Sequence, residues 1–343
     1  MPHPLKRHPA KTIDAVASRR RRPRIGLALG SGSARGLAHV GVIRAIEDAG
    51  IQIDCIAGTS MGALVGAVHA AGKLNELENA FLDFDWKKTA SFFDVVLPRS
   101  GLLDGAKVSE LVRSHIHTND IEALSIGFAA VASDLQSGSE VVICTGDIIE
   151  AVRASVSVPG IFTPVRRNGQ ILVDGGLVNP VPTSVARAMG ADFIIAVDLN
   201  HQIVNGKNLK PLLPTVANAK KATRDAQLPP GWKAVYSQTM QNLKQKLLAI
   251  DAPGRAQFAR WLSTEERLPS IFEVLLASIN IMETSITQTR LHIDQPDIII
   301  QPPLGHIRFL EFGRAEEIIA IGYEHTRQQL ATLDQTLLSR IKL

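Results

Sequence analysis

Short apolar runs alternate with stretches of helical periodicity from residue 25 to residue 200, and this alternation constrains the fold more than any other feature. Runs that predict strands lie at residues 25–29, 53–57, 128–132, 141–144, 171–173 and 193–197. Segments that predict helices lie at residues 35–49, from the end of the 58–62 motif to about residue 71, and at residues 148–155 and 183–189. Strand–helix alternation of this kind predicts an α/β fold of three layers, with a mainly parallel central sheet and helices on both faces.

The chain beyond residue 200 has a different texture. Residues 201–230 are rich in Lys, Asn and Pro, whereas residues 236–250 and 271–286 carry apolar side chains at helical spacing. Residues 297–301 predict a last strand and residues 314–332 a closing helix. We therefore expect a flexible basic tail over 1–24, a core over 25–200, a helical insertion or lid over 201–290, and a C-terminal strand and helix over 291–343 that complete the core.

Positive charge is concentrated at the N-terminus. The 343 residues carry a net charge of +4, but residues 1–24 alone hold eight Lys/Arg and one acid, Asp14, which leaves the rest of the chain slightly acidic. This distribution gives little support to nucleic-acid recognition by the folded body. The tail is interpreted as a solvated leader. The alternative is that the arginine cluster, residues 19–22 with Arg24, contacts anionic lipid or RNA, at about 1 kcal/mol per basic residue near a charged membrane.

Apolar runs in this chain are far shorter than the roughly 20 residues that span a bilayer. The five apolar residues after the arginine cluster are also too few for a secretory signal. Cys55 and Cys144 lie in strand-like apolar surroundings, which favours two buried thiols over a disulfide. We expect a cytoplasmic protein, with peripheral contact to the inner face of the membrane as the role open to the tail.

Residues 58–62 read Gly-Thr-Ser-Met-Gly and match the G-x-S-x-G nucleophile elbow. In such an elbow, a tight strand-to-helix turn exposes the serine hydroxyl at a helix N-terminus, and the flanking Gly58 and Gly62 leave room for the turn. The ordinary alternative is a helix cap in which the Ser60 hydroxyl accepts from backbone amides.

A glycine-rich loop, Gly30-Ser31-Gly32-Ser33-Ala34-Arg35-Gly36, follows the first predicted strand. Its amides suit an anion, which could be a tetrahedral oxyanion or a dinucleotide pyrophosphate. In the dinucleotide-binding fingerprint the third glycine comes one position earlier than Gly36 does here, and an acid lies at the far end of the second strand. Because Asp54 lies at the start of that strand and the serine elbow at its end, the pattern favours acyl chemistry.

Asp174-Gly175-Gly176 follows the predicted strand at 171–173. A carboxylate at a strand end could serve as the base for Ser60, and an Asx turn is the alternative for such an Asp-Gly pair.

Taken together, these motifs resemble the patatin-like phospholipases, and most closely the bacterial branch related to neuropathy target esterase. The resemblance covers about residues 24–200 and 295–325, and it includes residues 132–138 and 155–162 as well as the stretch from Val173 to Pro182. It implies a patatin-like fold and a serine acyl hydrolase of the lipid esterase, phospholipase or lysophospholipase type, with a lipid or acyl-ester substrate. It also implies a Ser60–Asp174 dyad and an oxyanion hole at Ser31, Gly32 and Ser33, supported by Gly30, Arg35, Gly36, Gly58, Gly62 and Gly175.

One departure from the family pattern concerns the loop, where Ser31 and Ser33 replace glycines. The exchange is harmless only if those backbone positions do not need a positive φ. Arg35 matches a basic position that could hold the loop, form a salt bridge or meet a phosphate headgroup. For Asp174 we predict a buried carboxyl within about 4 Å of Ser60, since an aspartate near its reference pKa of about 3.9 is a weak base.

Other functions compete with the hydrolase. An α/β-hydrolase triad would need one of His201, His292, His306 or His325, but its elbow normally follows more strands. His39 is interpreted as a packed or capping residue, and Asp198 as the cap of a turn. His115 and His117 suggest no metal site, and we expect no cofactor. A regulatory or scaffold protein with little turnover is the non-enzyme alternative.

Overall fold

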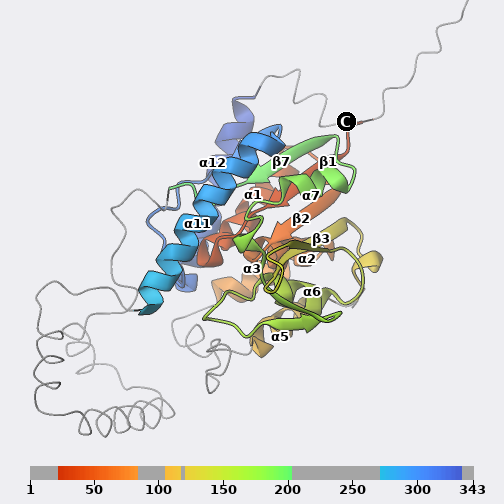
Figure 1. The fold of residues 1–343 in the computed structure, drawn as a ribbon. Coiled ribbons are helices and arrows are strands. Elements are labelled where there is room, and N and C mark those ends of the chain that lie inside the picture. The colour runs from red at the N-terminus through yellow and green to blue at the C-terminus, as the bar shows by residue number, and fades with distance from the viewer. Residues whose placement is uncertain (1–21, 84–104, 117–119, 203–270, 334–343) are drawn as a thin grey trace, which may run out of the picture.

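The computed structural model describes residues 22–83, 105–116, 120–202 and 271–333 (Figure 1). Within these ranges one eight-stranded sheet forms the centre of the molecule. Its strand order is β5 (Val165–Arg167), β6 (Gln170–Asp174), β3 (Gly127–Asp134), β2 (Cys55–Thr59), β1 (Ile25–Leu29), β7 (Phe193–Val197) and β8 (Ile298–Ile300), and β4 (Glu140–Ile143) also pairs with β3.

Strand direction divides the sheet into two parts. The five strands from β3 to β8 run parallel, whereas β4, β5 and β6 attach to β3 and to one another in antiparallel pairs. The carboxyl ends of β1 and β2 therefore meet at one edge, and β6 approaches β3 from the opposite direction. This arrangement delivers Gly30, Ser60 and Asp174, which end three different strands, to one place.

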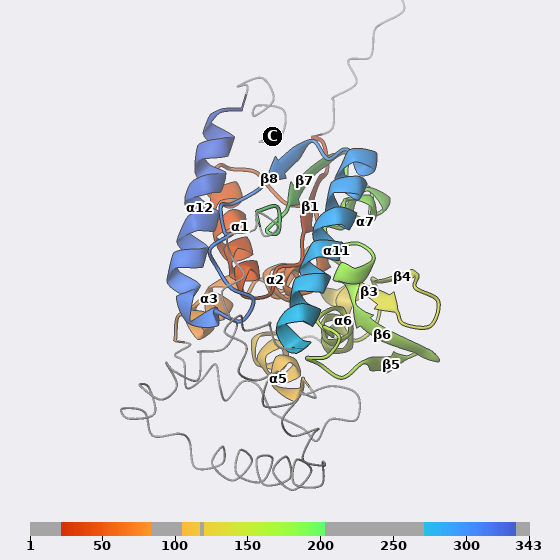
Figure 2. The ribbon, with the colours of Figure 1, turned by 60° about the vertical axis from the view of Figure 1, so that its left-hand side comes forward.

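Helices cover both faces of the sheet. In Figure 2, α1 (Ala38–Asp48) and α12 (Ala315–Ala331) lie on one side of β1, β7 and β8, and α7 (Thr183–Ala188) and α11 (Ile271–Asp294) lie on the other. The remaining helices are α2 (Met61–Ala70), α3 (Leu74–Leu82), α5 (Ala106–His115) and α6 (Ile148–Ser155), with 3-10 turns at Ser33–Leu37, Ile121–Ala123, Gly175–Leu177 and Phe312–Arg314. The expected α/β architecture with helices on both faces is confirmed.

The hydrophobic core has two layers because side chains alternate along each strand. Leu27 and Leu29 of β1 point into the larger cluster, with Leu37 and Ile43, while Ala28 points into a smaller cluster against α7. All five residues of β1 are buried, as expected of a central parallel strand.

Most predicted elements lie where the sequence placed them. Strands β1 and β7 and helix α6 have the predicted bounds, and β8 and α12 differ by one residue at each end. Strand β2 runs two residues later than predicted, since Gly58 and Thr59 continue the ladder with β3. Helices α3 and α5 and strand β5 were not predicted. The helix predicted at 236–250 lies outside the described residues, and the one predicted at 271–286 is part of α11.

Two local features bear on the expectations for the tail and the cysteines. Arg22 donates from both terminal guanidinium nitrogens to Asp54, at 2.9 and 2.6 Å. The last of the four consecutive arginines at residues 19–22 is therefore fixed to the folded body. Both cysteines are free thiols, but only Cys55 is buried; Cys144 is exposed after the short strand β4, which corrects the expectation of two buried thiols. In the described part of the chain, no helix is long and apolar enough to cross a bilayer.

Candidate active site

Ser60 stands at the turn between β2 and α2, where the backbone is held in an unfavourable conformation. Its φ of 57° lies in a region that non-glycine residues rarely adopt. The turn is tight because a Cβ on Gly62 would lie 2.1 Å from the Leu29 carbonyl oxygen, and one on Gly58 would lie 2.5 Å from the Gly62 carbonyl oxygen. Both flanking glycines are therefore required for close approach, as the elbow pattern predicts.

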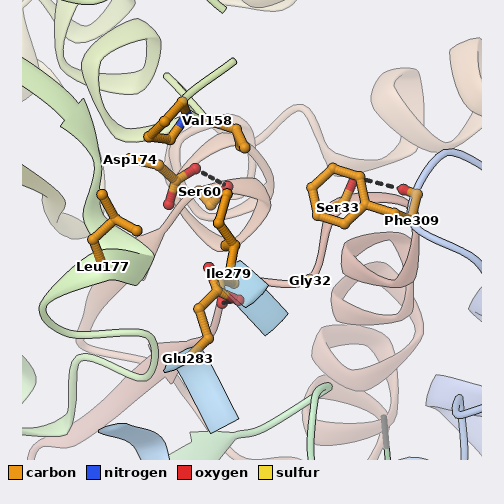
Figure 3. A pocket seen from close by; sticks show the side chains of 11 residues that line it. Gly32, Ser33, Ser60, Val158, Asp174, Leu177, Ile279, Glu283 and Phe309 are labelled. Atoms are coloured by element: carbon orange, nitrogen blue, oxygen red, sulfur yellow. Dashed lines mark hydrogen bonds between the residues drawn. The ribbon is translucent and has the colours of Figure 1, made fainter. Parts of the chain in front are cut away.

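The Ser60 hydroxyl does not cap helix α2. It donates instead to Oδ2 of Asp174 at 2.6 Å, across 114 residues of sequence (Figure 3). The distance lies well inside the predicted limit of about 4 Å, and the simple helix-cap interpretation of Ser60 is excluded.

Asp174 uses its two carboxyl oxygens for different partners. Oδ1 accepts from the amide of Gly176 at 2.7 Å, which is an Asx turn, while Oδ2 accepts from Ser60. The side chain is 2% exposed, and burial raises the pKa of Asp174 to about 6 against the hydrogen bonds from Ser60 and Gly176. Asp174 thus forms the Asx turn and also lies within hydrogen-bond reach of Ser60, and its raised pKa makes the carboxyl a stronger base than an ordinary aspartate.

The glycine-rich loop is anchored at both ends and leaves two amides without an acceptor in its middle. The Gly30 amide donates to Val197 O, the Ser31 amide to Pro180 O at 2.8 Å, and the Ala34 amide to Phe309 O. Among the residues that the structure describes, the amides of Gly32 and Ser33 have no acceptor. Because its amide is already used, Ser31 is removed from the predicted set of oxyanion donors.

Ser33 has a φ of 48°, so the condition for a harmless exchange of glycine is not met at this position. A left-handed conformation costs a non-glycine residue roughly 1–2 kcal/mol. The Ser33 hydroxyl donates to Phe309 O at 2.5 Å, which offsets part of this cost (Figure 3).

Arg35 is buried, and its side chain connects the glycine-rich loop to α11 and to the C-terminal segment. Its guanidinium donates to Ile307 O at 3.1 Å and to Asn280 Oδ1 at 3.4 Å, and desolvation lowers its pKa to about 10. At 3% exposure the side chain is not available to a headgroup in solvent. His39 is likewise a packed residue, as expected: its Nε2 lies 2.7 Å from Gly30 O, and burial lowers its pKa to about 4, so the neutral ring donates to the loop.

Comparison with known proteins places this geometry in a family. Residues 27–187 match the model of the patatin-like phospholipases. The chain is 32% identical, over 91% of its length and 92% of the relative, to an uncharacterized NTE family protein of Mycobacterium tuberculosis. A second NTE family protein of that species is 31% identical over 95% of this chain and 50% of its own length. The patatin-like phospholipase domain-containing protein 7 of Mus musculus is 26% identical, over 88% of this chain and 20% of its own length.

The chain belongs to the patatin-like phospholipase family, in its NTE branch. The match confirms the resemblance and supports a lipid hydrolase. It includes the loop, Ser60 and Asp174, and it ends before α11 begins.

Two residues that contact the elbow or the loop were not singled out from the sequence. Ser155 at the end of α6 accepts from the Ser60 amide at 2.9 Å and donates to Val131 O at 2.6 Å, so its hydroxyl fixes the elbow to β3. Glu283 of α11 accepts from the Ser31 hydroxyl at 3.0 Å, across 252 residues. The segment around Ser155 belongs to the family resemblance, but Glu283 has only one local signal, an acid inside an otherwise apolar and small-residue helical stretch.

Two adjoining pockets meet at Ser60. The first contains the loop residues and the two acids Asp174 and Glu283, together with apolar side chains such as Leu177 and Ile279 (Figure 3). The second is lined almost entirely by apolar side chains from α2, α3, α5, the segment after α6 and the C-terminal segment, namely Met61, Leu64, Phe81, Val108, Leu111, Val156, Val158, Ile161, Phe162, Phe309, Leu310 and Phe312, with Ser33 and Ser60 at its edge.

Other polar candidates lie apart from these pockets. No histidine of the described residues lines either one. Asp198 accepts from the Asn200 amide and from Gln301, which confirms the turn-cap interpretation. Within the described ranges no cluster of three or more His, Cys, Asp or Glu could hold a metal ion.

Proposed function

We propose that this protein is a serine acyl hydrolase that cleaves carboxylic esters of lipids with a Ser60–Asp174 dyad. Ser60 Oγ attacks the ester carbonyl as its proton passes to Asp174 Oδ2. The C–O bond to the alcohol then breaks, and the proton moves from Asp174 to the departing oxygen. Water, deprotonated by the same carboxylate, releases the acid and regenerates the serine.

The observation that carries this proposal is the 2.6 Å hydrogen bond between the Ser60 hydroxyl and the buried Asp174 carboxyl, at an elbow with φ 57°. The Asp174 pKa of about 6 leaves the carboxyl mostly ionised at pH 7 while keeping it basic enough to take a proton. No third residue is needed to orient this base, since the Gly176 amide fixes Oδ1.

The amides of Gly32 and Ser33 are the proposed oxyanion hole. Both residues line the pocket that holds Ser60, and both amides lack an acceptor among the described residues. Preorganised donors of this kind, aimed at a developing negative charge, contribute roughly 2.7–4 kcal/mol each when they are well placed.

The apolar pocket beside Ser60 suits an acyl chain rather than a polar acid. Its lining comes from at least four separate elements and offers no charged side chain. A lipid ester placed there buries its chain against Phe81, Leu111 and Phe309, which favours binding by about 25 cal/mol for each Å² of apolar surface removed from water. Contact of the basic tail with a membrane, and a cytoplasmic location, remain predictions.

The test is covalent labelling of the purified protein with a fluorophosphonate, followed by peptide mass spectrometry. We expect one adduct, on Ser60, that is absent in Ser60→Ala and at least a hundredfold slower in Asp174→Asn. Hydrolysis of lipid esters by the same samples would identify the reaction. A folded protein that neither labels nor hydrolyses esters would contradict the proposal and favour the scaffold alternative.

A further inference from the structure

Helix α11 places one acid inside the catalytic pocket that the proposed dyad does not use. Glu283 is 7% exposed and lines the same pocket as Ser60 and Asp174 (Figure 3). It comes from residues outside the part of the chain that matches the family model. A buried carboxyl beside an oxyanion site is electrostatically unfavourable in its charged form, so its presence calls for a physical explanation.

The hydrogen bonds of Glu283 identify the oxygen that would carry a proton. Oε2 accepts from the Ser31 hydroxyl at 3.0 Å and from Asn200 Nδ2 at 3.0 Å, and the Asn200 amide also donates to the Ser31 hydroxyl at 3.1 Å. Two donors already occupy Oε2. A proton on this carboxyl therefore belongs on Oε1.

Oε1 faces Asp174 across Gly176. A Cβ built on Gly176 would lie 2.1 Å from Glu283 Oε1 and 3.0 Å from Asp174 Oδ1, so the two carboxyl groups share the space above this glycine. Two acids so close in a buried site do not both ionise readily. The site therefore holds one negative charge more easily than two.

Three charged groups act on Glu283 from the neighbouring elements. Burial and the charge of Asp174 raise the pKa of Glu283 to about 8, and Asp198 at the end of β7 adds to this effect. Arg35 and the hydrogen bond from Ser31 oppose it. Neutral Glu283 is thus the prevailing form at pH 7, on electrostatic as well as on geometric grounds.

We propose that Glu283 is a positioning residue that works as a neutral acid, holding the glycine-rich loop through Ser31 and Asn200 while keeping a second negative charge out of the site. This inference rests on the proposed hydrolase function. When Glu283 loses its proton, its negative charge repels the oxyanion that forms at the loop. Reactivity of Ser60 should therefore fall at alkaline pH.

The test is the pH profile of Ser60 labelling by a fluorophosphonate, corrected for the reactivity of the probe in buffer. In the unaltered protein the rate should rise as Asp174 ionises near pH 6 and fall about tenfold between pH 7 and pH 9, as expected for loss of one proton with a pKa near 8. Glu283→Gln keeps a carbonyl for Ser31 and Asn200 and cannot ionise. Whatever its labelling rate at pH 7, that rate should be the same at pH 9.

Glu316→Gln makes the same chemical change on the exposed face of α12 and should retain the alkaline loss. Glu283→Gln with an unchanged alkaline loss would overturn the proposal. Should the unaltered protein neither label nor hydrolyse esters, the proposed function fails instead. The amide NMR signals of Gly32 and Ser33 then still test Glu283: they should shift with a midpoint near pH 8 in the unaltered protein and stay constant in Glu283→Gln. A midpoint at the ordinary glutamate pKa would refute the role of Glu283 whether or not the protein is an enzyme.

Discussion

The amide of Ser60 donates a hydrogen bond to the hydroxyl of Ser155 at 2.9 Å, and that hydroxyl donates to Val131 O at 2.6 Å. Ser155 is fully buried. The Ser155 hydroxyl therefore links the Ser60 amide to β3, next to the ladder that pairs Thr59 with Val131, and supports the strained φ of Ser60.

Replacing Ser155 by Ala should leave the Ser60 amide and Val131 O unpaired in the core. We expect a loss of about 1–3 kcal/mol in the free energy of unfolding and at least a tenfold fall in the rate of Ser60 labelling. Urea unfolding and fluorophosphonate kinetics measure the two effects. Ser278→Ala, on the exposed face of α11, removes a similar hydroxyl and should change neither. Full reactivity of Ser155→Ala would show that the elbow holds its shape without this contact.

Asp174→Asn should abolish activity while preserving the fold. The Asn oxygen can accept from the Gly176 amide, and its NH₂ can donate to Ser60, but it cannot take a proton. Loss of a general base costs about 10²–10⁴-fold, which should appear in kcat more than in KM. Asp83→Asn, at the exposed end of α3, is the matched control. Retention of more than a tenth of the activity in Asp174→Asn would exclude Asp174 as the base.

Sequence alone predicted the central part of this fold because its elements are locally determined. Strands β1 and β7 are buried on both faces and appear as unbroken apolar runs, and α6 has both amphipathic periodicity and an Asp147 cap on the Glu150 amide. The short helices α3 and α5 have weaker patterns. Strand β2 was placed two residues early because the apolar run ends at Ala57 and Gly58 is a poor strand former, whereas pairing with β3 keeps the chain extended through Thr59.

The positions of Ser60 and Asp174 at strand ends were predictable for a similar reason. Ser60 and Asp174 each sit in a glycine-flanked turn at a strand end. Because β6 is antiparallel to β3, parallel topology does not bring these two ends together, and their pairing was predicted from the family resemblance. Glu283 has no such turn around it, and nothing near it in the sequence indicates that α11 crosses the loop at Ser31. Availability of the Ser31 amide was also beyond local reasoning, since its acceptor, Pro180 O, lies in a different loop.

Ser33 offers a test of strain in the oxyanion loop. Ser33→Gly removes the cost of a positive φ, whereas Ser33→Ala keeps it, and both lose the hydroxyl that donates to Phe309 O. The glycine variant should therefore exceed the alanine variant by about 1 kcal/mol in the free energy of unfolding. Chemical denaturation of the pair measures this difference. Equal stabilities would mean that the loop relaxes to a negative φ once the hydroxyl is gone.

Stability should fall as pH rises from 6.5 to 8. Below this window two pairs of groups have opposite effects on the pH dependence of stability. Asp174 and Glu283 have raised pKa values and bind protons that the unfolded chain has released. His39 and His69, whose pKa values are lowered to about 4, have released protons that the unfolded chain still binds. Above the ordinary histidine pKa of 6.5, the excess proton on Glu283, whose pKa is about 8, dominates.

The free energy of unfolding should then drop by at most about 1.4 kcal/mol per pH unit while Glu283 keeps its proton, and level off once Glu283 has ionised above pH 8. Urea unfolding at pH 6.5, 7.3, 8 and 9 checks the slope. Glu283→Gln should flatten this slope, and Glu316→Gln should leave it as it is. A slope that persists in Glu283→Gln would assign the proton to another group.

Leu111→Trp should separate the acyl pocket from the dyad. Leu111 lies half-buried on α5 and lines the apolar pocket, so the larger ring would fill space meant for the chain without touching Ser60 or Asp174. We expect hydrolysis of long-chain esters to fall at least tenfold, because each methylene displaced from the pocket loses about 0.8 kcal/mol of binding free energy. A butyrate ester has only one or two such methylenes to lose, so its hydrolysis, like fluorophosphonate labelling, should stay within about threefold. Leu82→Trp, on the exposed end of α3, is the control. Equal loss on short and long esters would mean that the acyl chain binds elsewhere, because a ring placed at Leu111 can obstruct only a substrate that reaches it.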